Sequence, residues 1–290
     1  MKPLNIAKHT FDWGARTYVM GILNITPDSF SGDGIIAQGD SLQVAVEQAR
    51  NFIASGADIL DVGGESTRPG SEPVDAEAEM ERVLPVVHAL SKEFPEILIS
   101  IDTYKAAVAG EALKAGAHIV NDVWALRADP ALAGVAARYN APVILMHNRS
   151  NPASVEVRQQ LGNAYIGAEY EDLLADVKRE LMDSVKLAQQ AGVPDERIIL
   201  DPGIGFGKTV AHNLELIRRL DEIRALGYPV LLGASRKSFI GFTLDLPADQ
   251  RVEGTAAAVC VGITRGADII RVHDVEHMVR IAKMTDAIIR

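Results

Sequence analysis

The 290-residue sequence contains a single cysteine, no long apolar run and no cluster of basic residues. Because Cys260 has no second cysteine to pair with, no disulfide forms within the chain. With no secretory leader either, we expect a reducing, cytoplasmic compartment. No apolar stretch approaches the roughly 18–20 residues of a membrane span, so we expect no membrane partner. The formal net charge of −10 argues against nucleic acid, since backbone phosphates are bound by grouped Lys and Arg.

Short apolar segments alternate with longer amphipathic segments from residue 17 to the end. The eight expected strands cover residues 17–25, 57–65, 97–103, 118–123, 142–147, 197–203, 229–235 and 267–274. Between them, segments such as 75–94 and 212–227 carry apolar residues at helical spacing, and glycines mark expected helix ends at Gly56, Gly116, Gly192 and Gly227. Apolar strands alternating with helices indicate a parallel sheet covered by helices, and eight units close a barrel. We predict an α/β fold of the (β/α)8 TIM-barrel type, with an open doubly wound sheet as the competing architecture.

The chain shows no internal boundary. No linker, low-complexity tract or block of charge divides it, so we predict one domain over residues 1–290, with the barrel proper at about 17–290. The segment before Tyr18 is expected to cover the barrel floor.

Polar residues stand where each expected strand ends, which is where TIM barrels place their chemistry. These residues are Asn24, Asp61 with Glu65, Asp102, Asn121 with Asp122, His147, Asp201, Ser235 with Lys237, and Arg271 with His273. One polar strand end is equally well explained as a cap for the next helix. Eight together indicate a single site. The loops after the first two strands are longer than the roughly 2–6 residues a connection needs, which favours mobile lids.

Two other motifs do not carry the function that they first suggest. The stretch "DPGIGFGKT" (201–209) resembles a phosphate loop, but only three residues separate Gly203 from Gly207, and Pro202 stands where an amide donor is required. The stretch "HDVEH" matches a zinc-peptidase pattern whose two histidines must share one helix. Here His273 ends an expected strand, and the helix is expected to begin only around Val275. We therefore expect neither a nucleotide loop nor a zinc site.

Seven motifs occur in one order along the chain: "MGILNITPDSFSGDG", "DVGGESTRPGS", "SIDTYKAAVA", "ND", "DPGIGFGKT", "GASRKSFIG" and "RVHDV". Together they closely resemble the dihydropteroate synthase family, from about Met20 to the end. The resemblance implies a transferase of folate biosynthesis. Such an enzyme joins 6-hydroxymethyl-7,8-dihydropterin diphosphate to p-aminobenzoate, releases pyrophosphate and 7,8-dihydropteroate, and uses Mg²⁺.

The resemblance assigns one group of residues to the pterin and aminobenzoate. A carboxylate can accept two parallel hydrogen bonds from the guanidine-like edge of a pterin, and an amide can donate and accept at once. By resemblance, the binding residues are Asp102, Asn121, Asp201, Lys237, Phe206, Gly233 and Ser235. Met146 either packs on the pterin face or fills the core. Gly203 and Gly205 are expected to let the ligand approach the backbone.

The resemblance assigns a second group to the departing anion. Arg271 and His273 leave the last strand two residues apart, so their side chains should face the same way. Asn24 is the implied Mg²⁺ ligand, with phosphate oxygens and water completing a hard octahedral site. The implied loop residues are Pro27, Phe30, Asp33, Ser66, Thr67, Arg68 and Pro69. The family's first loop usually reads "SFSDGG", so the order "SFSGDG" places Asp33 one position later.

We expect a dissociative reaction in which diphosphate leaves before the aromatic amine attacks. The implied catalytic residues are Arg68, Lys237, Arg271 and His273. Ser235 has Ala234 and Arg236 beside it and no evident base, which favours loop positioning over nucleophilic catalysis. Two alternatives remain: a pterin-binding methyltransferase of the methyltetrahydrofolate and corrinoid type, and a non-catalytic pterin-binding paralogue. The small apolar helix "TAAAVCVGIT" could form a homodimer contact or simply cover the barrel.

Overall fold

The computed structural model describes residues 1–26, 41–66, 71, 73–150, 155–158, 162–165 and 168–290. Its central sheet has eight parallel strands in the order β10-β7-β6-β5-β4-β3-β12-β11. They are β3 (Tyr18–Asn24), β4 (Ile59–Gly63), β5 (Leu98–Asp102), β6 (Ile119–Asp122), β7 (Val143–Met146), β10 (Ile198–Asp201), β11 (Leu231–Leu232) and β12 (Ile269–Val272). A parallel bridge between Leu200 and Val230 joins the two ends of the sheet. The predicted TIM barrel and all eight predicted strands are confirmed.

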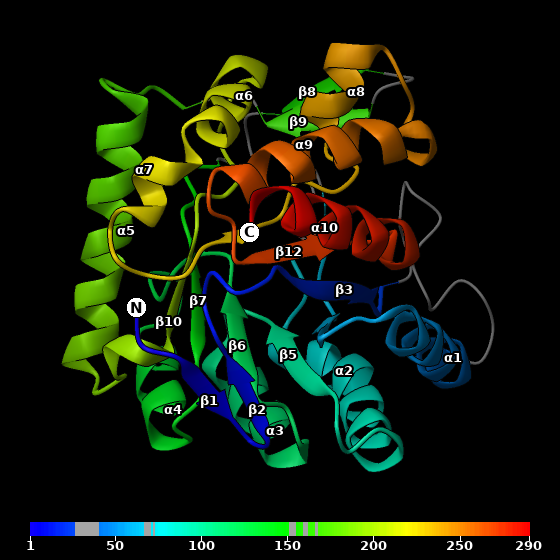
Figure 1. The fold of residues 1–290 in the computed structure, drawn as a ribbon. Helices are drawn as coiled ribbons and strands as arrows, with labels where there is room; N and C mark the ends of the chain where they lie inside the picture. The colour runs from blue at the N-terminus through cyan, green and yellow to red at the C-terminus, as the bar shows by residue number, and fades with distance from the viewer. Residues whose placement is uncertain (27–40, 67–70, 72, 151–154, 159–161, 166–167) are drawn as a thin grey trace.

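Helices cover the outside of the strands (Figure 1). They are α1 (Ser41–Ser55), α2 (Ala76–Glu93), α3 (Ala106–Ala115), α4 (Leu132–Arg138), α5 (Leu173–Gln190), α6 (Val210–Arg218), α7 (Leu220–Arg224), α8 (Ser238–Leu244), α9 (Val252–Thr264) and α10 (Val275–Ile289). The four glycines expected at helix ends all adopt positive φ, between 93° and 115°, as left-handed helix ends require.

The two helical segments named from the sequence differ in how well they were predicted. Helix α2 begins after Asp75, whose carboxylate accepts a hydrogen bond from the Ala78 amide at 2.8 Å, and the predicted apolar face packs inward. Segment 212–227 was predicted as one helix, but it is two, α6 and α7, divided at Arg219 where ψ is 27°. The predicted face is buried all the same, since Leu216 and Leu220 lie on either side of this break with no exposed surface.

The strands divide their side chains between two cores. Residues such as Leu60, Ile99 and Leu200 point outward into the large cluster shared with the helices. Their alternate neighbours, such as Ile59, Leu98 and Ile199, form a separate apolar layer inside the barrel. This alternation is the two-residue period of a strand. Of every two successive side chains along a strand, one therefore points into the barrel.

The N-terminal segment closes the barrel floor as predicted. It forms an antiparallel hairpin of β1 (Leu4–Ile6) and β2 (His9–Phe11), which lies across one end of the barrel in Figure 1. Leu4, Ile6 and Phe11 are buried in the same cluster as the innermost strand residues. A second hairpin was not predicted. It pairs β8 (Val155–Arg158) with β9 (Gly162–Tyr165) and comes between β7 and α5 along the chain.

Candidate active site

A polar layer lies inside the barrel, directly above the apolar floor layer. Its members stand two residues after the floor-layer residue of each strand, so the strand period turns them to the same interior. Its polar members are Asp61, Ser100, Asn121, Asp201 and Arg271, and Ile22, Met146 and Gly233 complete the layer on the other three strands. Another two residues along, toward the mouth, come Asn24, Asp102, Ser235 and His273. Most of the strand-end residues predicted from the sequence are thus brought to one barrel mouth. Asp122 and His147 are not, because the Asp122 carboxylate accepts from the Trp124 and Leu126 amides and the His147 ring contacts Glu180 on α5.

Arg271 lies among the acids of this layer. Its Nε donates to Asp61 Oδ2 at 2.6 Å, and its Nη2 donates to Asp102 Oδ2 at 2.6 Å. Asn121 Nδ2 also donates to Asp61 Oδ2, at 3.1 Å. Asp61 has no exposed surface, and its Oδ1 has no hydrogen-bond partner within the described protein. Arg271 therefore connects two carboxylates, and Asp61 retains one oxygen able to accept from a ligand.

Sequence reasoning named Asp61 as a strand-end residue but gave it no role in binding. The signal was present, because Asp61 follows Ile59 by two residues within an otherwise apolar strand. A carboxylate in the middle of a buried strand faces either the helices or the barrel interior. Only the register of β4 shows that Asp61 faces the interior.

Burial is the main cause of the pKa shifts of Asp102, Asp201 and Lys237 at this mouth. Burial raises the pKa of Asp102 to about 7, against the opposing effect of Arg271. Burial also raises the pKa of Asp201, which Lys237 partly offsets. The pKa of Lys237 falls to about 8 for the same reason, against the opposing effect of Asp201. The neighbouring Asp61 and Asp102 outweigh burial for Arg271 and raise its pKa. A ligand that pairs with these groups relieves a desolvation cost that the protein already carries.

A second part of the mouth is formed by Asp201, Lys237 and Gly233. Asp201 Oδ1 accepts from the Gly203 amide at 2.7 Å, and Lys237 Nζ donates to the Ile204 carbonyl. A Cβ added at Gly233 would lie 3.7 Å from Asp201 Oδ2 and 3.9 Å from Lys237 Nζ. Gly233 therefore keeps the space beside both charged groups open.

Lys237 also lies over the ring of Phe206, with 4.7 Å between its Nζ and the ring centroid. This contact combines a cation with an aromatic face. The predicted residues Asp201, Phe206, Gly233 and Lys237 are thus neighbours, although β10 and β11 supply them from different parts of the chain.

The structure corrects the interpretation of Ser235. The Ser235 Oγ lies 3.1 Å from His273 Nδ1 and accepts from the His273 amide at 3.2 Å. A basic side chain is therefore in contact with Ser235, which its sequence neighbours did not reveal. One hydroxyl thus contacts both the backbone amide and the ring of His273. Ser235 fixes the orientation of His273.

The structure also corrects the reason for the glycines after β10. A Cβ at Gly203 would lie 1.8 Å from the His147 carbonyl oxygen, and one at Gly207 would lie 2.4 Å from the Arg149 carbonyl carbon. A Cβ at Gly205 would meet the Lys237 side chain at 3.3 Å. All three glycines have positive φ. They allow the protein's own backbone and side chains to approach, where a ligand was expected.

The remaining predicted residues divide between described and undescribed parts of the chain. Asn24 ends β3 opposite Gly63, and Met146 ends β7 opposite Asp201. Ser66 Oγ accepts from Ser71 Oγ at 2.8 Å. The expected loop residues Pro27, Phe30, Asp33, Thr67, Arg68 and Pro69 lie outside the described residues, as do parts of the two expected mobile lids.

The described residues include no group of three or more His, Cys, Asp and Glu able to hold a metal ion. Helix α10 begins at Val275, as predicted, so His273 and His277 do not lie on one helix. None of the helices in the described part of the chain is long and apolar enough to cross a membrane.

The arrangement suits a flat, polar heterocycle. Buried acids and an amide at one level can accept and donate along its edge, and Lys237 with Phe206 borders the outer part of the mouth. His273, two residues after Arg271, adds an imidazole ring on the same side of the chain. Two neighbouring ligands, one of them anionic, match this distribution of charge.

Comparisons with known proteins support this description. The pterin binding enzyme family matches residues 20–273. The chain is 49% identical over 288 residues to a dihydropteroate synthase of Clostridium beijerinckii, covering 99% of this chain and all of that protein.

Solved structures give the same likeness. The dihydropteroate synthase of Clostridium difficile, determined in the presence of pteroic acid, is 48% identical with a TM-score of 0.86 over 97% of this chain and 99% of that one. The dihydropteroate synthase of Xanthomonas albilineans with 4-aminobenzoic acid is 38% identical with a TM-score of 0.85, over 97% and 94% of the two chains.

Proposed function

The chain belongs to the pterin-binding enzyme family and functions as a dihydropteroate synthase, and we propose that it works by losing diphosphate before the amine attacks. The substrates are 6-hydroxymethyl-7,8-dihydropterin diphosphate and p-aminobenzoate, and the products are 7,8-dihydropteroate and pyrophosphate. The observation that carries this conclusion is the buried cluster of Asp61, Asp102, Asn121 and Arg271 within a barrel matched over nearly its whole length. The methyltetrahydrofolate-type and non-catalytic alternatives are not favoured by these likenesses.

We propose that the pterin edge binds the inner acids. Asp201 and the free Oδ1 of Asp61 are acceptors for the amino and ring N–H groups, and Asn121 supplies an amide. Lys237 would donate to a ring acceptor from beside Asp201. Met146, at the level of Asp201, is proposed to pack on the pterin face.

We propose that Arg271 and His273 stabilise the departing diphosphate. Arg271 uses two of its five N–H donors on Asp61 and Asp102, which leaves three for an anion. Charge grows on diphosphate as the C–O bond breaks, so donors aimed at it act most strongly in the transition state. The electron-rich dihydropterin delocalises the resulting cation at its exocyclic methylene, and the aromatic amine then attacks. Thr67 and Arg68 are proposed to lie over the substrates.

Mg²⁺ is proposed as the cofactor. Asn24 at the end of β3 supplies an amide oxygen, and the described residues hold no dedicated set of acidic ligands. This donor set fits a hard cation held mainly by diphosphate oxygens and water, with little from the protein. When bound, the ion would neutralise charge on the leaving group.

A homodimer is also proposed. Exposed apolar side chains gather on the two packed C-terminal helices, with Val261 on α9 and Met284, Ile288 and Ile289 on α10. Light scattering should give a mass of about twice the chain. The reducing compartment expected from the lone cysteine remains a prediction.

The decisive experiment mixes the purified protein with the pterin diphosphate, Mg²⁺ and labelled p-aminobenzoate. We expect pyrophosphate and labelled dihydropteroate in equal amounts, with inhibition by a sulfonamide that mimics p-aminobenzoate. Binding of the pterin without turnover would indicate the non-catalytic paralogue. Methyl transfer from methyltetrahydrofolate would indicate the methyltransferase.

A further inference from the structure

Lys208 is a buried lysine to which the reaction assigns no role. It follows the glycines of the loop 203–207, yet only 3% of its surface is exposed. Its Nζ donates to the Gly203 carbonyl at 2.9 Å and to the Phe206 carbonyl at 3.0 Å, and lies 3.0 Å from His147 Nδ1. With a longer contact to the His147 carbonyl at 3.4 Å, these acceptors surround the amine and favour its protonated form, against burial, which lowers the pKa of Lys208. The lysine closes the loop on itself and joins it to the end of β7.

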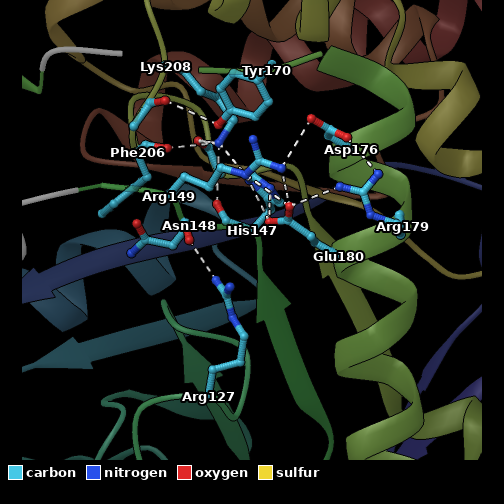
Figure 2. A network of polar contacts seen from close by, with 12 residues as sticks. Arg127, His147, Asn148, Arg149, Tyr170, Asp176, Arg179, Glu180, Phe206 and Lys208 are labelled. Carbon is cyan, nitrogen blue, oxygen red and sulfur yellow. Dashed lines mark hydrogen bonds and ion pairs between the residues drawn. The ribbon is translucent and has the colours of Figure 1, made fainter. Parts of the chain in front are cut away.

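The contacts of Lys208 continue into a polar network (Figure 2). His147 Nε2 donates to Glu180 Oε2 at 3.0 Å, and Arg149 Nε donates to Glu180 Oε1 at 3.0 Å. Burial holds the pKa of His147 at about 4, so its neutral ring accepts at Nδ1 and donates at Nε2. Glu180 on helix α5 thus holds the His147 ring, and the ring in turn fixes the position of the Lys208 amine.

The network returns to the loop through Tyr170. The Arg149 guanidinium lies 4.4 Å from the centre of the Tyr170 ring, and the Tyr170 hydroxyl donates to the Gly207 carbonyl at 3.2 Å. The loop is thus bonded at Gly203, Phe206 and Gly207 to groups outside the barrel mouth. Hydrogen bonds at three carbonyls restrict the conformations that the loop can adopt.

The other side of this loop faces the substrates. The Gly203 amide donates to Asp201, the Ile204 carbonyl accepts from Lys237, and Lys237 lies over the Phe206 ring. Every one of these contacts requires the loop to keep the shape that Lys208 gives it.

We propose that Lys208 is a positioning residue that sets the shape of loop 203–207, and so places Phe206, which the family resemblance puts at the wall of the p-aminobenzoate pocket. This inference rests on the proposed function. Asp201 depends less on Lys208, because strand β10 holds it through pairing with β7. The effect should therefore fall mainly on p-aminobenzoate and less on the pterin.

The test compares the variant Lys208→Met with the wild-type enzyme and with Lys186→Met. Methionine keeps the apolar part of the side chain, at a length one atom shorter, and removes the amine. Lys186 is an exposed lysine on α5 whose ion pair with Asp183 lies on the surface, which makes it a matched control. We expect Lys208→Met to raise the KM for p-aminobenzoate at least tenfold, to raise the pterin KM less than threefold, and to lower kcat less than threefold. Lys186→Met should match the wild type.

A residue that only stabilised the fold would lower the melting temperature and the active fraction, leaving both KM values unchanged. That result for a folded Lys208→Met protein would overturn the proposal. If Lys208→Met does not fold, His147→Leu removes one acceptor and leaves both carbonyl contacts of Lys208. The p-aminobenzoate KM should then rise in the same direction by a smaller factor, and an unchanged value would overturn the proposal. An inactive wild-type protein would instead reject the proposed function.

Discussion

Arg271 balances the charge of two acids in the barrel mouth. It pairs with Asp61, which is fully buried, and with Asp102, which is nearly so. Replacing it by glutamine leaves these carboxylates unpaired in a poorly solvated place. Removing one partner of a buried pair costs about 3 kcal/mol or more in the free energy of unfolding. We expect Arg271→Gln to lose about that much in urea denaturation and to lower kcat more than tenfold.

The double variant Asp61→Asn with Arg271→Gln separates the two effects. It removes the unpaired carboxylate together with its cation, so part of the lost stability should return. Turnover should not recover, because the donors proposed for diphosphate are still missing. Normal turnover in Arg271→Gln would remove the assignment to the leaving group.

The pH dependence of catalysis should follow Asp102 and Lys237. A carboxylate must be ionised to accept from the pterin, and the raised pKa of Asp102 lies at about 7, so kcat/KM should fall as pH decreases below 7. The lowered pKa of Lys237 lies at about 8, so its cation is lost, and kcat/KM should fall, as pH rises above 8. Profiles from pH 5.5 to 9.5 should form a bell. In Asp102→Asn the acidic limb near pH 7 should disappear, and its persistence there would assign it to another group.

At the scale of the residue, the sequence named almost all of the described site but not how its members contact one another. Asp102, Asn121, Asp201 and Arg271 follow from strand period and position. The contact of Ser235 with His273 does not, because it joins residues 38 positions apart. The role of Lys208 could not be predicted for the same reason. Its acceptor on His147 lies 61 positions away in the sequence, and Lys208 follows a loop with three glycines of positive φ.

The loop after β10 has a backbone that is closely restricted by its neighbours. Gly203 combines a φ of +70° with a gap too small for a Cβ, which would lie 1.8 Å from the His147 carbonyl oxygen. Gly227, at the end of α7, has a φ of +93° and no atom within 4 Å of its added Cβ. The two positions therefore share backbone strain but differ in crowding.

We expect Gly203→Ala to be far more harmful than Gly227→Ala. At Gly227 the cost should be only the left-handed strain of about 1–2 kcal/mol in the free energy of unfolding. At Gly203 the collision adds to that strain and displaces the loop, so stability and p-aminobenzoate affinity should fall together. Equal losses in chemical denaturation of the two variants would show that the contact with β7 is unimportant.

At the scale of the element, the sequence predicted the strands well and the connections poorly. Short apolar runs predict the eight strands, because a strand of a parallel sheet is buried on both faces and is therefore apolar along most of its length. Strand β8, VEVR, alternates apolar and polar residues, but it is only four residues long and its partner β9, GNAY, shows no such alternation. The break at Arg219 falls within an uninterrupted helical pattern, so local sequence gives no signal for it.

The whole molecule separates stability from chemistry along the barrel axis. The hairpin and the lowest strand residues form an apolar floor, whereas the acids and cations lie at the opposite end of the strands. TIM barrels in general divide their two faces in this way. A substitution at each end should therefore change one property without the other.

Phe11→Ala and Gly233→Ala test this separation. Phe11 is 3% exposed in the floor cluster, so its truncation should lower the free energy of unfolding by about 3–5 kcal/mol and leave both KM values unchanged. Gly233 has room for a methyl group at ordinary contact distances from Asp201 and Lys237, so the fold should keep its stability. That methyl group would occupy the space beside both charged groups, and the pterin KM should rise at least tenfold. Denaturation curves and steady-state kinetics on both variants would measure the two effects. A change in KM for Phe11→Ala would mean that the floor and the mouth are coupled through the barrel.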